Sequence, residues 1–283
     1  MDAKKLYQRL EEDFIEPGLS DDWAEYMEEV KDFLSDNFKK RSMGLVCDNS
    51  REISRVYTAV FPTDEVMQRI LDSGATDALL FVHHPSIWDI TKAPNVFQQM
   101  NRELLRQFRE RRISIYNLHV PLDKSGEYST SGTLARALGI NPEKDFAPYF
   151  GGLCGVVGRT DCRTVTELSK QFDKAVGHRT ILYPYGRKEI DGGRVAVIAG
   201  GGNDVEMLEE VAREGVNTFI TGITALNDHS RKAHDYAKHH RISVLGGTHY
   251  STEAFACRAM CNYFEKSGLS CMFCEGEPGL QDL

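Results

Sequence analysis

The chain has 283 residues and a formal net charge of −8, and 41% of the residues are hydrophobic. This length accommodates one large domain or two of ordinary size, and the acidic balance argues against a nucleic-acid surface. Neither a signal peptide nor a membrane-spanning run is expected. Seven cysteines, an odd number, and nine histidines suit a reduced interior better than a disulfide scaffold, so we expect a cytoplasmic protein that binds neither membrane nor nucleic acid.

Two helices are predicted before the first strand. Apolar residues recur at helical spacing over residues 4–15, and Ser20 is a candidate N-cap for the second helix. The apolar face of that second helix would consist of Trp23, Met27, Val30 and Leu34. We expect this N-terminal helical extension, residues 1–42, to cover a core or a subunit interface rather than to supply chemistry.

Short β-prone runs alternate with helical segments through the rest of the chain. Strands are predicted at residues 43–47, 54–61, 78–82, 113–117, 179–185, 194–200, 217–222 and 241–247. Helices are predicted after Thr63, over about 95–111, after Ser129 or Thr130, after the capping box Thr164–Glu167, over about 204–214 and 230–239, and from about 251. Residues 147–155, rich in Pro and Gly, are expected to be irregular.

This alternation predicts an α/β protein with mostly parallel sheets flanked by helices. A helix, a glycine, a strand and a polar loop occur in this order at 63–86 and again at 204–224. Arg-Ile-Ser, a strand and a His-containing loop likewise occur at 112–119 and 241–249. We therefore predict two similar α/β lobes, residues 43–146 and 147–283, with a metal site between the lobes.

The stretch FVHHPSIWD places two adjacent histidines, His83 and His84, at the end of a predicted strand. Successive side chains of a strand point to opposite faces, and Pro85 favours an extended His84 at the start of a loop. Two such histidines can reach two different ions, although one core histidine and one exposed histidine is the plainer alternative. Two further polar pairs also follow short apolar strands, and their members are His119 with Asp123 and His249 with Glu253.

The histidines and carboxylates of these strand-end loops form a hard-to-borderline ligand set. Zinc, iron, manganese, nickel or cobalt suits such a set better than a soft metal. A carboxylate such as Glu253 can bridge two cations, and paired cations activate water and stabilise an oxyanion. Each cluster alone would more often be structural, so their shared position after strands carries the prediction of two divalent metal ions.

The elements HHP, HVPLD and HYSTE resemble the family of GTP cyclohydrolase I type 2 homologues, also described as dinuclear-metal-centre hexameric proteins or NGG-one-interacting-factor-three-like proteins. The similarity extends from about residue 43 over most of the chain. The resemblance implies His83 and Asp123 on one metal, His84 and His249 on the other, and Glu253 shared. It also implies a two-lobed α/β fold and a homohexamer, a trimer of dimers, with the sites facing a central cavity.

The resemblance places His119 close to the site, as an outer partner of the ligands or as a catalytic group. The expected function is a dinuclear metal-dependent hydrolase in which a metal-activated water attacks a small-molecule substrate, with His119 and Glu253 catalytic. The family name implies GTP, but a related nucleotide, phosphoester or amide would use the same metals. The alternatives are a non-catalytic metal-binding hexameric scaffold, metal carrier or regulatory protein, and a nucleotide-binding module without chemistry.

Three other features have structural and functional interpretations. Gly200-Gly201-Gly202 is read first as a tight strand–helix turn and second as a phosphate contact. The histidines along residues 229–240 are read mostly as solvated. Four cysteines near the C-terminus favour buried free thiols over a structural zinc site, and they are Cys257, Cys261, Cys271 and Cys274.

Overall fold

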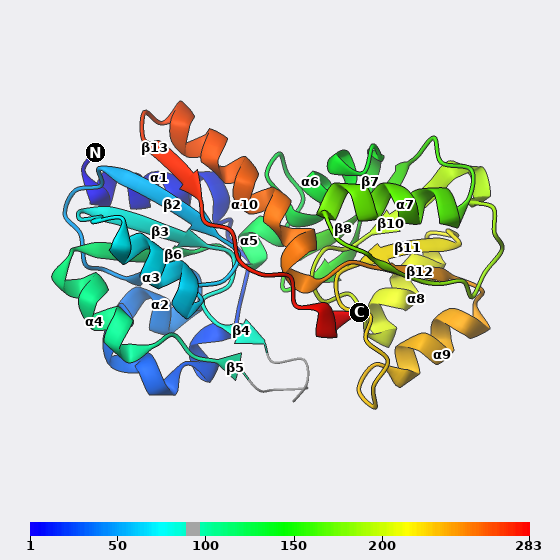
Figure 1. Ribbon diagram of the computed structural model, residues 1–283, viewed down its shortest axis with the longest axis horizontal. Coiled ribbons are helices and arrows are strands. Elements are labelled where there is room, and N and C mark those ends of the chain that lie inside the picture. The colour runs from blue at the N-terminus through cyan, green and yellow to red at the C-terminus, as the bar shows by residue number, and fades with distance from the viewer. Residues whose placement is uncertain (89–96) are drawn as a thin grey trace. The chain divides into compact units, whose positions relative to one another are not determined.

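The computed structural model describes residues 1–88 and 97–283, and the chain divides into two compact units (Figure 1). The first unit comprises Met1–Leu122 with Cys257–Gly276, and the second comprises Asp123–Ala256 with Glu277–Leu283. Each unit is built on one main β-sheet flanked by helices, which confirms the predicted α/β class with two lobes. The predicted domain limits at 42/43 and 146/147 stay predictions.

The sheet of the first unit has the strand order β1-β6-β3-β2-β13. Its strands are β1 (Gly44–Cys47), β2 (Arg55–Ala59), β3 (Ala78–Val82), β6 (Ile113–Asn117) and β13 (Ser270–Phe273). The four strands β13, β2, β3 and β6 pair in parallel, and β1 pairs antiparallel with β6. Strand β13 at the sheet edge was not predicted. A separate pair of short strands, β4 (Ile87–Trp88) and β5 (Phe97–Gln98), lies outside this sheet.

Helices cover both faces of the first sheet. The helices of this unit are α1 (Ala3–Phe14), α2 (Asp36–Arg41), α3 (Asp64–Asp72), α4 (Arg102–Glu110) and the one-turn α5 (Val120–Asp123). Leu80 and Val82 of β3 pack in one core with apolar residues of α3 and α4. Phe81, which points to the other face, packs against Phe264 with ring centroids 5.6 Å apart. Side chains that point to opposite faces of β3 are therefore buried alike, as expected for a central parallel strand.

The prediction of a second N-terminal helix after Ser20 is wrong. The chain forms two 3₁₀ segments there, Trp23–Tyr26 and Glu28–Phe33, and the N-cap Ser35 instead starts the short α2. The residues expected on the apolar face are nevertheless all buried, and they are Trp23, Met27, Val30 and Leu34. Burial of this face was thus predictable from the apolar spacing, whereas the type of helix was not.

Helix α4 also begins later than predicted. Asn101 caps it, because its side-chain oxygen accepts hydrogen bonds from the backbone N–H groups of Glu103 and Leu104 at 2.9 and 3.4 Å. Phe97 and Gln98 form β5 instead, and the predicted start near Asn95 lies outside the described residues.

The sheet of the second unit has the order β7-β8-β10-β11-β12-β9. Its strands are β7 (Asn141–Tyr149), β8 (Gly152–Arg159), β9 (Ile181–Tyr183), β10 (Arg194–Val197), β11 (Thr218–Thr221) and β12 (Ser243–Gly246). The prediction of irregular structure over 147–155 is wrong, because β7 and β8 pair there as an antiparallel hairpin. Pro148 is compatible with this pairing since β7 is an edge strand, where a missing N–H donor is tolerated.

Helices pack on both faces of the second sheet. They are α6 (Thr130–Ala137), α7 (Val165–Val176), α8 (Val205–Arg213), α9 (Arg231–His239) and α10 (His249–Lys266). Apolar residues of α6 and α7 form one core with Val195 and Val197, and those of α8 and α9 form another with Ala196 and Ile198. Helix α10 starts in the second unit, and its residues from Cys257 onward belong to the first.

The two units repeat one pattern, as the sequence suggested. Each contains three parallel strands, β2-β3-β6 in one and β10-β11-β12 in the other, and the third strand of each pairs antiparallel with one further strand. A left-handed glycine follows the helix before the second strand in both, Gly74 (φ 73°) and Gly215 (φ 66°). Arg112 and Arg241 precede the third strand with φ values of 55° and 57°. These matches support an internal duplication. None of the described helices has the length and apolar character needed to cross a membrane.

Candidate metal centre

The paired histidines lie directly after β3 in the first unit. The backbone N–H groups of His83 and His84 continue the parallel ladder, donating to the carbonyl oxygens of Ala59 and Val60 at 3.2 and 2.9 Å. Their rings are 4.3 Å apart between centroids, and the side chains are 0% and 3% exposed. The alternative of one core and one exposed histidine is therefore wrong, because His84 is buried as well and packs against the rings of Trp23 and Phe61.

The His83 ring is oriented by a backbone carbonyl. Its Nδ1 lies 2.9 Å from the carbonyl oxygen of Leu118, an atom that can only accept a hydrogen bond. Nδ1 must therefore carry the proton, so Nε2 carries the lone pair in the neutral ring. A metal-ligating histidine has this arrangement, in which the second ring nitrogen donates to an outer acceptor.

His119 has an acidic partner from the N-terminal segment. Its Nδ1 lies 2.9 Å from Oδ2 of Asp21, whose side chain is 0% exposed. The ring of Trp23, two residues further on, lies edge-on at 5.4 Å from both His84 and His119, measured between centroids. Residues 1–42 therefore contact His119 in addition to covering a core, as expected for this segment. No motif in the sequence connects Asp21 to His119, which is 98 residues away.

His83, His84 and His119 form what we call the histidine cluster. Each offers a ring nitrogen, and these atoms all lie within 4.8 Å of one another. Phe61 stacks on His84 with ring centroids 5.0 Å apart, so aromatic rings pack around the cluster. Buried imidazoles at this spacing suit zinc, iron, manganese, nickel or cobalt, and such a cluster can bind a metal ion.

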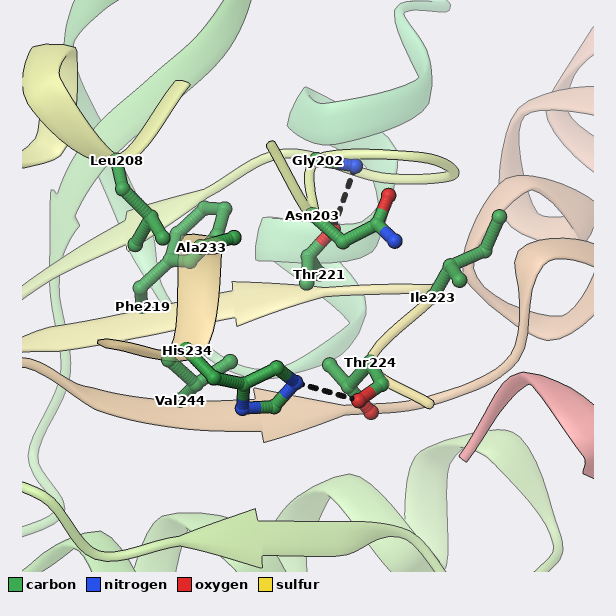
Figure 2. A pocket seen from close by; sticks show the side chains of 10 residues that line it. All are labelled: Gly202, Asn203, Leu208, Phe219, Thr221, Ile223, Thr224, Ala233, His234 and Val244. Carbon is green, nitrogen blue, oxygen red and sulfur yellow. Dashed lines mark hydrogen bonds between the residues drawn. The ribbon is translucent and has the colours of Figure 1, made fainter. Parts of the chain in front are cut away.

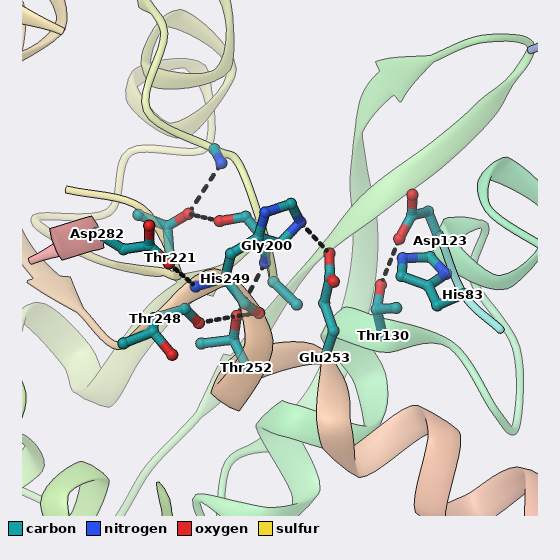
Figure 3. A network of polar contacts seen from close by, with 12 residues as sticks. His83, Asp123, Thr130, Gly200, Thr221, Thr248, His249, Thr252, Glu253 and Asp282 are labelled. Carbon is teal, nitrogen blue, oxygen red and sulfur yellow. Dashed lines mark hydrogen bonds and ion pairs between the residues drawn. The ribbon is translucent and has the colours of Figure 1, made fainter. Parts of the chain in front are cut away.

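His249 and Glu253 are one turn apart at the start of α10 in the second unit (Figure 3). His249 Nε2 lies 3.1 Å from Glu253 Oε1, and the residues are 9% and 2% exposed. The helix starts at His249, two residues before the predicted start, because Asp282 accepts a hydrogen bond from the His249 backbone N–H at 2.8 Å. Burial raises the pKa of the Asp282 carboxyl above its ordinary value.

Asp123 is the third candidate ligand of the second unit. Its Oδ1 accepts a hydrogen bond from the Thr130 hydroxyl at 2.8 Å, at the start of α6 (Figure 3). Asp123 and Glu253 also offer carboxylate oxygens that lie within 4.8 Å of each other, as do the offered atoms of His249 and Glu253. We call Asp123, His249 and Glu253 the carboxylate cluster, in which Glu253 lies within reach of both other residues.

Gly200 leaves room for the Glu253 side chain. It has φ +72°, and a Cβ built there would collide with Glu253 Oε1 and would lie 3.3 Å from the His249 ring. Its N–H donates to the Thr252 hydroxyl at 3.0 Å (Figure 3). The Gly202 N–H donates to the Thr221 hydroxyl at 3.0 Å (Figure 2). These amides are engaged inside the protein, which favours the tight-turn interpretation of the three glycines over a phosphate contact.

A pocket of about 250 Å³ lies beside this turn in the second unit (Figure 2). His234 is part of its lining and is 7% exposed, so the solvated interpretation is wrong for this residue. Its Nε2 lies 2.9 Å from the Thr224 carbonyl oxygen, and its Nδ1 lies 2.9 Å from the Tyr185 hydroxyl. Desolvation on burial lowers the pKa of His234, so the ring is a neutral connector within the fold.

The two clusters contain every side chain that the sequence nominated for metal binding or catalysis. His83, His84 and His119 come together within the first unit, and Asp123, His249 and Glu253 come together within the second. Sequence reasoning missed Asp21, Trp23 and Asp282, which contact these residues from the chain ends. The donor chemistry fits divalent cations, because buried ionisable groups in proteins are paired or coordinate metals.

Comparison with known proteins finds relatives that match most of the chain. The sequence profile described as "Duf34/NIF3 (NGG1p interacting factor 3)" matches residues 20–278. A protein of Pyrococcus horikoshii named GTP cyclohydrolase 1 type 2 homolog is 29% identical over 246 residues, which is 85% of this chain and 92% of that protein. A protein of the same name from Escherichia coli K12 is 28% identical over 210 residues, covering 72% of this chain and 80% of that protein.

Solved structures with the same fold span nearly the whole chain. The structural-genomics protein ybgI, described as of unknown function, has a TM-score of 0.77 at 22% identity and covers 99% of this chain and 100% of its own. HcgD from Methanocaldococcus jannaschii, solved in its reduced form, has a TM-score of 0.67 at 22% identity, with 98% of each chain covered. At these identities the structural likeness shows the fold alone. The profile match over most of the sequence shows that the chain belongs to the DUF34/NIF3 family.

Proposed function

We propose that the protein is a dinuclear metal-dependent hydrolase. In this proposal two divalent ions, drawn from zinc, iron, manganese, nickel and cobalt, are bound jointly by the histidine and carboxylate clusters. His83 and Asp123 bind one ion, His84 and His249 bind the other, and Glu253 is shared. Bound ions of this kind supply positive charge that activates water and stabilises a developing negative oxygen.

The proximity of two buried carboxylates is the observation that carries the proposal. Asp123 and Glu253 are 9% and 2% exposed, and their offered oxygens lie within 4.8 Å of each other. Two negative charges at this spacing repel strongly in a poorly solvated environment. A divalent cation bound by both would convert this repulsion into attraction, so the pairing favours a metal site over a structural role.

The surrounding residues hold these ligands in position. The Thr130 hydroxyl donates to Oδ1 of Asp123 and so orients this carboxylate. Asp282 fixes the first turn of α10, and Gly200 admits the Glu253 carboxylate. Such outer contacts orient metal ligands and reduce the entropy lost when a metal binds.

His119 is suited to proton transfer. The Asp21 carboxylate accepts the hydrogen bond from Nδ1–H, so Nε2 is the atom that takes a proton from water or returns one to a leaving group. The buried Asp21 charge also stabilises the imidazolium formed when Nε2 is protonated. We therefore assign His119 the role of proton carrier, with Glu253 as the shared ligand on which turnover depends.

The proposed substrate is a small molecule, with a nucleotide as the first class to test. The curated relatives carry the name GTP cyclohydrolase 1 type 2 homolog, so GTP is the leading candidate. We also propose a homohexamer, a trimer of dimers, acting in the cytoplasm, which suits a chain with seven unbridged cysteines. The competing proposal, a non-catalytic metal-binding scaffold, carrier or regulatory protein, rests on the same ligands.

Metal content and turnover measured together test the proposal. Purified protein would be loaded separately with each candidate metal, desalted, and analysed by inductively coupled plasma mass spectrometry. The same samples would be incubated with GTP, a panel of phosphoesters and a panel of cyclic amides. The variants would be His83→Ala, Glu253→Gln and, as matched control, His239→Ala, because His239 is an exposed histidine of α9.

The hydrolase proposal expects two ions per chain in the wild type and in the control. It also expects fewer ions in His83→Ala and loss of turnover in Glu253→Gln. Tight binding of two ions without turnover of any substrate class would contradict the hydrolase and support the carrier. Unchanged metal content in both His83→Ala and Glu253→Gln would contradict the dinuclear centre itself.

A further inference from the structure

Four cysteines lie in the last 27 residues, and their pairing differs from what their spacing suggests. Cys257 and Cys261 have helical spacing, and Cys271 and Cys274 form a C-x-x-C pattern. In the first unit, however, the Sγ atoms of Cys261 and Cys271 lie 3.0 Å apart. Among the described residues, the groups with metal-ligand spacing contain no cysteine, so the four thiols do not assemble a zinc site.

The pair arises because α10 and β13 both pack beside β2. Strand β13 pairs in parallel with β2, and Cys271 stands opposite Val56 in the ladder. From α10, Cys257 Sγ donates to the Ala59 carbonyl oxygen at 3.3 Å, and Cys261 Sγ lies 3.3 Å from the Thr58 hydroxyl. Cys274 belongs to the buried core of the unit and is 2% exposed. Cys261 and Cys271 are both partly exposed.

The contacts of Cys261 favour its thiolate. The Cys271 thiol donates a hydrogen bond to Cys261 Sγ, and the Thr58 hydroxyl is a second donor within reach. These hydrogen bonds lower the pKa of Cys261 to about 7. The same hydrogen bond raises the pKa of Cys271, since the proton it donates is shared with a neighbouring sulfur. One thiol of the pair is thus ionised near neutral pH while the other keeps its proton, as in dithiol redox sites.

We propose that Cys261 and Cys271 form a thiol modification site, in which Cys261 reacts with a soluble low-molecular-weight disulfide and Cys271 resolves the product as an intramolecular disulfide. Cys261 Sγ attacks one sulfur of the reagent, so a mixed disulfide forms and the first thiolate leaves. Cys271 then loses its proton to solvent and attacks Cys261 Sγ, and the second thiolate leaves. The reagent gains two electrons and two protons in total, and the protein loses them.

The geometry supports the resolving step. A disulfide requires sulfur atoms about 2.05 Å apart, so the two Sγ atoms need to approach by only about 1 Å. The product would connect α10 to β13, the edge strand of the sheet. A disulfide between partly exposed cysteines that forms and breaks in response to its surroundings is the kind found inside cells, where permanent disulfides are rare.

Trapping with glutathione disulfide tests this site on the full-length, metal-loaded protein. Reduced protein would be incubated with glutathione disulfide near neutral pH, quenched with iodoacetamide, digested and analysed by mass spectrometry. We expect a cross-linked peptide pair joining Cys261 to Cys271 in the wild type. Cys271→Ser should instead accumulate a glutathionyl adduct on Cys261, and Cys261→Ser should give neither product.

The internal control is Cys162, a partly exposed cysteine of the second unit whose Sγ lies 3.2 Å from Gln171 Oε1. Cys261 should react with iodoacetamide several-fold faster than Cys162 near pH 7, because the hydrogen bonds from Cys271 and Thr58 favour the Cys261 thiolate. Thr58→Val removes one donor while preserving shape, so it should slow alkylation of Cys261.

Wild-type protein that forms no cross-link under these conditions would overturn the proposal, as would a cross-link that joins other cysteines. This arm requires no variant, so misfolding of a serine variant cannot obscure the result. Circular dichroism of each variant would show whether a missing adduct reflects the lost thiol or a lost fold.

Discussion

His119 Nδ1 and Asp21 Oδ2 lie 2.9 Å apart, and the Asp21 side chain is completely buried. The two residues are separated by 98 positions in the chain, so only folding brings them together. Asp21 also accepts a long hydrogen bond from the Val120 backbone N–H at 3.5 Å. This carboxylate orients the His119 ring, and it brings the N-terminal segment into contact with the histidine cluster.

Replacing Asp21 with Asn should lower turnover by the proposed hydrolase and leave metal content unchanged. The amide of Asn can present its NH₂ group to Nδ1 of His119, which would move the imidazole proton to Nε2 and stop Nε2 from taking a proton. Loss of a general acid–base group typically costs about 10²–10⁴-fold in rate. Elemental analysis would report the bound metal, and turnover would be measured with the substrate class that the panel identifies.

The matched control for this variant is Asp22→Asn. It removes the same charge from the neighbouring position, where the carboxylate lies 3.4 Å from the Tyr26 hydroxyl instead of His119. A loss of turnover equal to that of Asp21→Asn would show that net charge, rather than the hydrogen bond to His119, governs turnover.

Gly200→Ala should reduce both stability and metal content. The left-handed backbone at φ +72° costs about 1 kcal/mol for a residue with a Cβ, and the new methyl group would also displace the Glu253 carboxylate. Thermal unfolding would report the stability, and elemental analysis would report the bound metal.

Gly215→Ala separates these two effects. Gly215 has φ +66°, but a Cβ at this position meets no atom within 4 Å. This variant should show the backbone cost alone, with metal content unchanged. Equal metal content in both variants would mean that space at Gly200 is unimportant for the Glu253 side chain.

Thr164→Ala should destabilise the second unit without affecting the metal site. Thr164 and Glu167 form a capping box at the start of α7, with the Thr164 hydroxyl accepting from the Glu167 N–H at 3.2 Å. Loss of such a cap costs about 1 kcal/mol. Urea unfolding monitored by circular dichroism would measure the change, and Thr164→Ser, which keeps the hydroxyl, should stay close to wild type.

The buried His234 predicts a loss of stability on acidification. Burial lowers its pKa in the folded protein, so the unfolded chain binds a proton more readily. The stabilising contribution is present above the ordinary histidine pKa of about 6.5 and is lost as the pH falls from there towards the lower folded-state value.

Urea unfolding at a series of pH values between neutral and about 5 would test this linkage. His234→Gln should have a shallower dependence on pH than the wild type over this window. His239→Gln, which changes an exposed histidine of the same helix, should keep the wild-type slope. If His234→Gln keeps the wild-type slope, protonation of His234 is not the cause of the stability loss at acidic pH.

Local sequence patterns were sufficient for most of the strands and caps of this protein. Residues 78–82 and 113–117 were predicted as strands from their apolar, β-branched and aromatic content, and β3 and β6 have these bounds. Thr63 and Thr164 were identified as caps because a hydroxyl before a helix satisfies an otherwise open N–H group. The segment around residue 150 was misread, since a proline in an edge strand is compatible with pairing.

The sequence alone determined which side chains can act as ligands, because strand ends and the first turn of a helix position His83, His84, Asp123, His249 and Glu253 through local geometry. Only the tertiary structure decided three long-range contacts. Asp21 accepts a hydrogen bond from His119, and Asp282 binds the first backbone N–H of α10. The partner of Cys261 is Cys271 rather than Cys257 or Cys274. Local propensities act over a few neighbouring residues, whereas these contacts join positions far apart in the chain or on different elements. Such pairings depend on how sheets and helices pack, which no short stretch of sequence specifies.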